Sequence, residues 1–209
     1  QQAIGDAILS TAKYMHLKAL MYDKHTDYDE NYRSLIDRQI TLHAKQDLVR
    51  EILFKTRSIV KESTHKGRTL LAVFKDTVDL FEQIMSSHVS YKLLHGVIDE
   101  ELLGSFEKTI AGVATELEFI GIAMQSGNRS VPHHSTAQAI SELEVYFDNY
   151  WNRFLDSTNA EALSSLRQVI ENIKSIHSRI LIMHRYTAYD PGFQAKVDPD
   201  VDRNKFISS

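Results

Sequence analysis

The fold is decided at the start of the chain, by residues 4–22, IGDAILSTAKYMHLKALMY, in which apolar side chains recur at steps of three and four. An α-helix has 3.6 residues per turn, so residues at these steps share one face, and we expect that face to enter a core. The first proline is Pro132, so 131 residues pass without the residue that breaks helix interiors. The sequence therefore predicts long helices.

The same spacing predicts five more helices further along the chain. Their expected ranges are 31–64, 68–91, 102–125, 135–154 and 158–186. The second would measure about 50 Å at 1.5 Å per residue, which favours an elongated shape. Ser135 with Gln138 and Thr158 with Glu161 have capping-box spacing and are expected to begin the last two helices. We expect an all-α fold, an elongated antiparallel bundle of about six helices with an irregular C-terminal tail.

The helical pattern ends after Tyr186, which divides the chain into two parts. We expect a helical bundle domain over residues 1–186 and an extended connector over residues 187–209, where prolines and a glycine interrupt the pattern. The chain starts at Gln1 with neither an initiator methionine nor a signal segment, so we interpret it as a piece of something longer. Its best apolar run, Phe119 to Met124, is too short to span a bilayer.

Composition argues against several functional classes. The chain has 209 residues, 24 Lys and Arg against 28 Asp and Glu, and no cysteine. A net charge of −4 disfavours a nucleic-acid partner, and the lack of cysteine removes disulfides and thiolate chemistry. The sequence also lacks a glycine-rich phosphate loop, a G-x-S-x-G elbow and an H-E-x-x-H motif. We therefore predict no enzyme, no catalytic residue, no cofactor and no nucleic-acid partner.

Three groups of side chains have part of the composition of a metal site. They are the carboxylates Asp76, Asp79 and Glu82, the pair Glu62 and His65, and the adjacent His133 and His134. Carboxylates at helical spacing usually form a solvated face, and a single Glu-x-x-His pair is half of what a di-iron bundle needs. The two adjacent histidines lie in a loop without a third ligand nearby in sequence. We predict no metal site.

Further side chains leave two interpretations open. His16, His177 and His184 lie in or beside apolar stripes and are expected to be hydrogen-bonded core or boundary residues. Positive charge gathers around the turn after the second helix, at Lys55, Arg57, Lys61, Lys66 and Arg68. These cations suit anionic lipid head groups if this end faces a membrane, and their place near a helix C-terminus accounts for them equally well.

Three stretches resemble segments of the YccS-like inner-membrane proteins. In residues 80–94, LFEQIMSSHVSYKLL, an acidic residue precedes a serine run, a histidine and a tyrosine, here Glu82, Ser86, Ser87, His88 and Tyr91. Residues 12–23, AKYMHLKALMYD, resemble the helix of the type A-x-Y-x-x-L-K-A that follows the first membrane half of that family. Residues 198–209 resemble the connector that precedes the second half.

The resemblance implies a parent in the fusaric-acid-resistance-like (FUSC) superfamily, which includes aromatic acid exporters. Two membrane-embedded halves would flank a helical region on the cytoplasmic face of the bacterial inner membrane, and this chain would be that region, with a structural, assembly or regulatory role. Its partners would be the flanking halves of the same polypeptide, with homo-oligomers and contact with the membrane surface left open. The five residues of the serine-containing stretch would form a polar structural or regulatory cluster.

An alternative is a stand-alone helical binding or scaffold module that senses a small aromatic ligand. An aromatic stripe in the fifth predicted helix motivates it, and its members are Tyr146, Phe147, Tyr150, Trp151 and Phe154. Stripes of this kind are more often core than pocket, because aromatic side chains dominate core burial. The sequence leaves both functions open.

Overall fold

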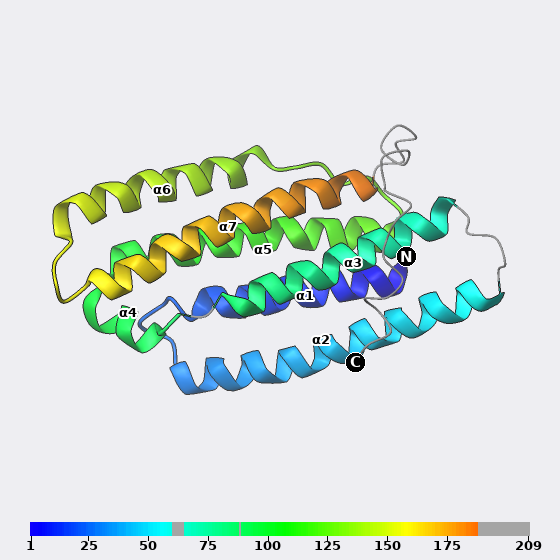
Figure 1. Cartoon of the computed structure of the whole chain (residues 1–209), viewed down its shortest axis with the longest axis horizontal. Coiled ribbons are helices and arrows are strands. Elements are labelled where there is room, and N and C mark those ends of the chain that lie inside the picture. The colour runs from blue at the N-terminus through cyan, green and yellow to red at the C-terminus, as the bar shows by residue number, and fades with distance from the viewer. Residues whose placement is uncertain (60–64, 88, 188–209) are drawn as a thin grey trace.

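The chain folds into long helices that run along one axis (Figure 1). The structure is a computed structural model and describes residues 1–59, 65–87 and 89–187. Within these ranges there are seven helices and no strand, so the all-α prediction is confirmed. The helices are α1 Gln2–Leu20, α2 Tyr28–Ile59, α3 His65–Ser86, α4 Tyr91–Val97, α5 Glu100–Ser126, α6 His134–Phe154 and α7 Ala160–Thr187. The expected connector, apart from Thr187 at the end of α7, lies outside the described residues.

The short helix α4 is the element that the sequence pattern did not predict. Ser90 caps its N-terminus by accepting a hydrogen bond from the Leu93 N–H, and Asp99 caps the next helix, α5, by accepting from the Leu102 N–H at 2.8 Å. Two local caps therefore divide a segment that we expected to lie between helices.

The two predicted capping boxes are wrong. Helix α6 begins at His134, ahead of Ser135, and its N-cap residue His133 makes no side-chain cap bond. Before α7, the Asp156 carboxylate accepts from the backbone N–H groups of Thr158 and Asn159, so Thr158 lies inside a turn that an aspartate organises. Asp156 caps this turn because an ionised carboxylate accepts hydrogen bonds more strongly than a hydroxyl group.

Helices α1 and α5 form the centre of the bundle and approach closely. A Cβ atom added at Gly5 would lie 2.9 Å from the Gly121 carbonyl oxygen, and one added at Gly121 would lie 2.7 Å from Leu9 Cγ. Only glycine leaves room for backbones this close. The fully buried side chains of the bundle include Phe74, Phe81, Phe106 and Phe147.

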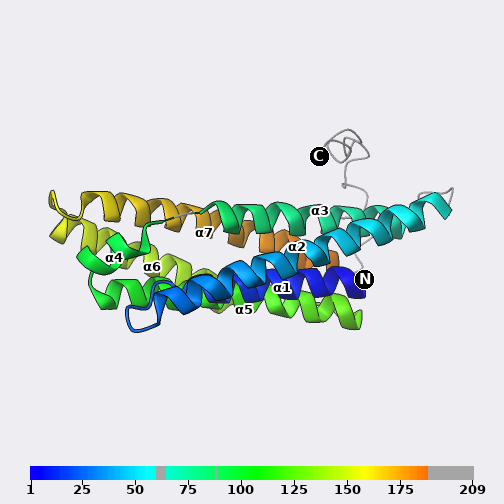
Figure 2. The same cartoon turned by 90° about the horizontal axis from the view of Figure 1, so that it is seen from below.

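Helix α2 lies at an edge and packs mainly against α1, with a smaller contact to α3. It has 32 residues against 19 in α1, and its C-terminal turns and the start of α3 project beyond α1, α5 and α7 (Figures 1 and 2). We call this end of the bundle the hairpin end; Gln1 and the end of α7 also lie there. The opposite end, which we call the acidic end, holds the α1–α2 turn, α4 and the start of α5.

Candidate functional site

A buried carboxylate between two histidines is the most unusual polar group of the described core. Glu116 on α5 is 1% exposed, and its Oε1 lies 3.0 Å from His184 Nε2 on α7. Its Oε2 lies 3.4 Å from Nε2 of His177, two turns earlier on α7. His177 and His184 are 8% and 3% exposed. A charged group this deep is stable only when it is paired, and the two imidazoles pair it.

The same cluster fastens the α5–α6 loop to α7. The His133 N–H donates to Glu116 Oε1 at 3.0 Å, and the His184 Nδ1 lies 2.9 Å from the Ser130 hydroxyl. The Ser130 N–H donates to the Thr187 hydroxyl at 2.8 Å. Glu116 on α5 is thus the common partner of α7 and the α5–α6 loop. We name the set Glu116, Ser130, His133, His177 and His184 the buried latch.

The surroundings of Glu116 hold it in its ionised form. Burial alone raises the pKa of a carboxyl group, but contacts with His177 and His184, the His133 N–H and the Thr136 hydroxyl outweigh it and hold the pKa of Glu116 well below its ordinary value. An anion therefore sits inside the bundle at neutral pH. Its Oε1 is held by the His133 N–H and the His184 ring, and its Oε2 faces the His177 ring, so the carboxylate has a fixed place between protein groups.

The sequence did reveal part of the latch. The expectation of core residues is confirmed for His177 and His184, and that of a hydrogen-bonded residue is confirmed for His184, which contacts Glu116 and Ser130. Their shared partner Glu116 was missed, although it stands alone among buried apolar residues of α5, between Val113 and Leu117. The seven-residue spacing of the two histidines, which places both on one face of a helix, was the available signal.

The polar cluster expected from the serine-containing stretch is not brought together among the described side chains. Glu82 and Ser86 are exposed, and the Ser86 hydroxyl donates to the Gln83 carbonyl of its own helix. The Ser87 hydroxyl instead accepts from Lys18 Nζ of α1 at 3.0 Å, while Lys18 also donates to the Ile84 carbonyl. His88 lies outside the described residues.

Tyr91, the last member of that cluster, belongs to the core. Its ring meets Tyr22 edge-on at 5.3 Å between centroids, and it is 6% exposed. Burial raises the pKa of Tyr91 well above its ordinary value, so it stays a neutral phenol. It holds α4 against the end of α1.

The candidate metal ligands are placed apart. The Asp76 carboxylate accepts from the Tyr186 hydroxyl at 2.6 Å, and Asp79 pairs with Lys75 at 2.6 Å. The His133 ring stacks on Phe119 at 4.7 Å, and Glu62 and the His65 side chain lie outside what is described. In the described part of the chain, no group of three or more His, Cys, Asp or Glu side chains is arranged to hold a metal ion.

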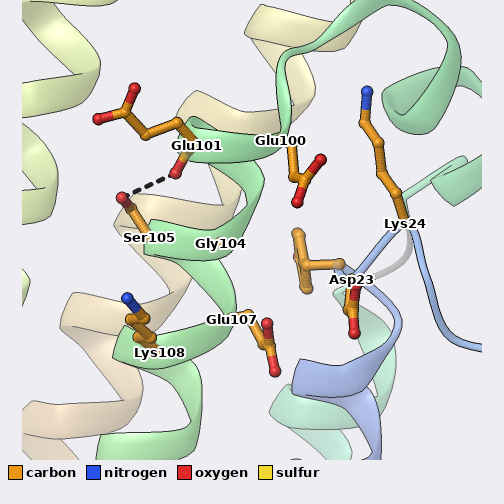
Figure 3. Close-up of a pocket in the computed structure, with 9 residues that line it drawn as sticks. Asp23, Lys24, Glu100, Glu101, Gly104, Ser105, Glu107 and Lys108 are labelled. Atoms are coloured by element: carbon orange, nitrogen blue, oxygen red, sulfur yellow. Dashed lines mark hydrogen bonds between the residues drawn. The ribbon is translucent and has the colours of Figure 1, made fainter.

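A surface pocket lies at the acidic end, between the α1–α2 turn and the first turns of α5 (Figure 3). Its volume is 580 Å³, and its lining includes four carboxylates and two lysines: Asp23, Glu100, Glu101, Glu107, Lys24 and Lys108. Burial and the nearby Asp23 raise the pKa of Glu107, and Lys108 opposes them. The excess of negative charge favours cationic groups there.

The aromatic stripe of α6 is used in packing. Phe147 is fully buried against Phe106, with ring centroids 6.1 Å apart, and it also contacts Trp151 at 5.8 Å. The Arg167 guanidinium of α7 lies 4.7 Å from the Phe147 ring centre and 5.6 Å from that of Trp151. These rings bind α6 to α5 and α7.

The fold and the buried latch define an all-helical domain that is held together by packing between helices. The comparison with protein families identifies the family to which this domain belongs. The model of the family described as FUSC-like inner membrane protein yccS matches residues 1–180. The chain therefore belongs to the FUSC-like family, which is related to membrane transport. No curated protein and no solved structure matches it. None of the helices in the described ranges is long and apolar enough to cross a bilayer.

Proposed function

We propose that this chain is the cytoplasmic helical domain of a FUSC-like inner-membrane transporter, and that it supports assembly or gating through helix packing. The family match over residues 1–180 supports the membrane context. The role in packing follows from what its polar core does, because the buried side chains with charge are used to fasten one element to another. The domain contributes no chemistry of its own.

The observation that carries this proposal is the buried latch. Glu116 joins α5, α7 and the α5–α6 loop at the end of the bundle where Gln1 and the end of α7 lie. A carboxylate that is buried between two histidines resists displacement of any one partner, because separation leaves an unpaired charge in the core. The helices at this end therefore move as one unit, which is what a domain that couples membrane segments requires.

The first test is to read the coding DNA on both sides of this segment and compute hydropathy over a window of about 19 residues. We expect several apolar spans on each side. Flanks without such spans would overturn the transporter assignment and leave a stand-alone helical module.

A second test addresses the side of the membrane and the role. A protease site placed in the exposed α6–α7 connection of the full-length protein should be cut only after the inner membrane is opened to the cytoplasm. In the same protein, Glu116→Gln should reduce transport or assembly more than Glu118→Gln, a change at a partly exposed carboxylate on the same helix. Cleavage from the periplasmic side would contradict the cytoplasmic location.

A further inference from the structure

We infer that the outer face of α2 binds a second copy of this chain through an antiparallel two-fold contact. The inference goes beyond the proposed function and does not depend on it. Helix α2 is the edge helix of the bundle and packs mainly against α1. Among the described helices, none covers its outer side (Figures 1 and 2).

Apolar side chains form an unbroken row along this outer side. Every fourth residue is apolar, and the row, which we call the α2 ridge, consists of Tyr32, Ile36, Ile40, Ala44, Leu48 and Ile52. Ala44 is exposed, and the five larger side chains are between 42% and 64% exposed. Residues four apart are neighbours on a helix surface, so the row is contiguous. Single exposed apolar side chains are ordinary, but a contiguous row of them is typical of a protein interface.

The α2 ridge has the form that another copy of itself would fit. Rows at four-residue spacing pack against one another in the commonest class of helix contact. The distance from Tyr32 to Ile52 corresponds to about 30 Å of helix at 1.5 Å per residue. A two-fold contact requires that each residue meet a partner that it meets again by symmetry.

The order of large and small side chains satisfies this requirement. With the two-fold axis between Ile40 and Ala44, Ile40 of each copy meets Ala44 of the other, and Ile36 meets Leu48. The smallest member of the α2 ridge therefore lies beside the axis, opposite a large one. A large side chain against a small one lets two helices interdigitate closely at their crossing.

The charges beside the α2 ridge suit the same arrangement. Arg33 and Glu51 are 18 residues apart, which is about five helical turns, so they lie on one line along α2 with the axis midway between them. In the antiparallel contact, Arg33 of each copy points toward Glu51 of the other. Asp37 lies across from Asp47, whose charge Arg50 already compensates at 2.7 Å.

Glu51 also has a partner within α2. It pairs with Lys55 one turn later, but both side chains are well exposed, so the pair is weak and leaves the carboxylate able to accept a second cation.

The charge balance of α2 favours a second copy over an anionic bilayer. Its described side chains, residues 28–55, include five acidic residues and five Lys or Arg, so two copies do not repel each other. A neutral surface gains nothing from anionic head groups, and helices that bind such lipids carry a strongly basic face.

Sedimentation of the purified 209-residue chain over a range of concentrations tests the inference. We expect a monomer–dimer equilibrium with a dissociation constant of about 10 μM, because one pair of helices is a small interface. Ile40→Ser with Leu48→Ser should raise this constant at least about a hundredfold, since apolar side chains are lost from both copies.

The matched control makes the same kind of change elsewhere, Ile122→Ser on α5 with Val145→Ser on α6. All four of these side chains are more than half exposed, so both variants should keep the fold and unfold at the same urea concentration as the unchanged chain. We expect the control to dimerise normally. A monomer at every concentration, or equal weakening by the control, would overturn the inference.

A charge exchange tests the antiparallel orientation. Arg33→Glu should weaken the dimer about fivefold, because a like charge replaces an opposite one at two symmetric places. Adding Glu51→Arg to the same chain should restore the original dissociation constant. Failure of the second change to restore it would refute the orientation. The DNA flanks decide the proposed function separately from any of these results.

Discussion

Glu116 gives the sharpest prediction at the scale of single residues. Glu116→Gln keeps the shape of the side chain but removes the charge that pairs with His177 and His184. We expect the free energy of unfolding in urea to fall by about 3 kcal/mol, because the buried groups that face the carboxylate lose a charged hydrogen-bond acceptor. Glu118→Gln, whose partner His16 lies 3.5 Å away at a partly exposed site, should cost about 0.5 kcal/mol. Equal losses would show that the buried latch adds no more than a surface pair.

The difference in stability between the unchanged chain and Glu116→Gln should depend on pH, because the pKa of Glu116 is lowered in the folded state. The folded state keeps the carboxylate ionised below the pH at which the unfolded chain takes up a proton. The stabilisation is therefore complete above the ordinary carboxyl pKa and is lost as the pH falls below it. The advantage of the unchanged chain over Glu116→Gln should shrink between about pH 5 and about pH 3 in urea titrations. A constant gap over that range would contradict the assignment.

Lys18 predicts a second rise of stability with pH, in alkaline solution. Burial lowers its pKa to about 8, whereas the unfolded chain keeps the ordinary value of 10.5. Between these values the unfolded state binds more protons, so stability should rise as the pH increases from about 8 to about 9.5, below the range in which tyrosines ionise. Lys18→Met should remove this rise in the urea midpoint. The exposed Lys13→Met on the same helix should keep it.

These residues also show where sequence reasoning stops at this scale. The histidines of the buried latch were placed in the core because their apolar neighbours recur at helical steps. The partnership with Glu116 joins residues 61 and 68 positions apart, and no local pattern specifies which helix faces which. Lys18 was noticed only as part of a family-like stretch, and its contact with Ser87 arises from the packing of α1 against α3.

At the scale of elements, the crossing of α1 and α5 sets a strict limit on side-chain size. Gly5→Ala would place a methyl group 2.9 Å from the Gly121 carbonyl oxygen of α5. A backbone oxygen cannot rotate away as a side chain can. We expect a loss of about 2 kcal/mol in unfolding free energy, because the helices must separate. Gly112→Ala, on the same α5 and with no atom within 4 Å, should instead gain about 0.5 to 1 kcal/mol through helix propensity. A gain at both glycines would mean that the crossing is loose.

The boundaries of the elements were predictable where apolar periodicity is long. The ranges expected for α1, α5 and α7 agree with the structure to within a few residues, because each buries a continuous stripe. Helix α4 was missed because seven residues are too few for a periodic signal and its limits depend on the caps Ser90 and Asp99. The close crossing at Gly5 was also hidden, since a glycine in a helix looks unfavourable until its neighbour is known.

At the scale of the whole molecule, the packing of α6 against its neighbours argues against the aromatic sensor. The side chains of the α6 stripe contact one another, Phe106 and the Arg167 guanidinium, so a ligand would have to displace core contacts. We expect the fluorescence of Trp151 to be unchanged by a panel of aromatic acids at millimolar concentration, with free tryptophan as the control for inner-filter effects. Saturable quenching would favour the sensor.

The pairing of α1 with α5 has a consequence for how the chain reaches its native state. Helix α1 is synthesised well before its principal neighbour, α5: the Gln125 amide bonds Asp6 across 119 positions. At about 5 to 20 residues per second, that distance takes about 6 to 24 s to synthesise. During this interval the apolar stripe of α1 has only α2 and α3 to cover it. The nascent chain therefore depends on those two helices, or on a chaperone, to shield α1 until the centre of the bundle closes.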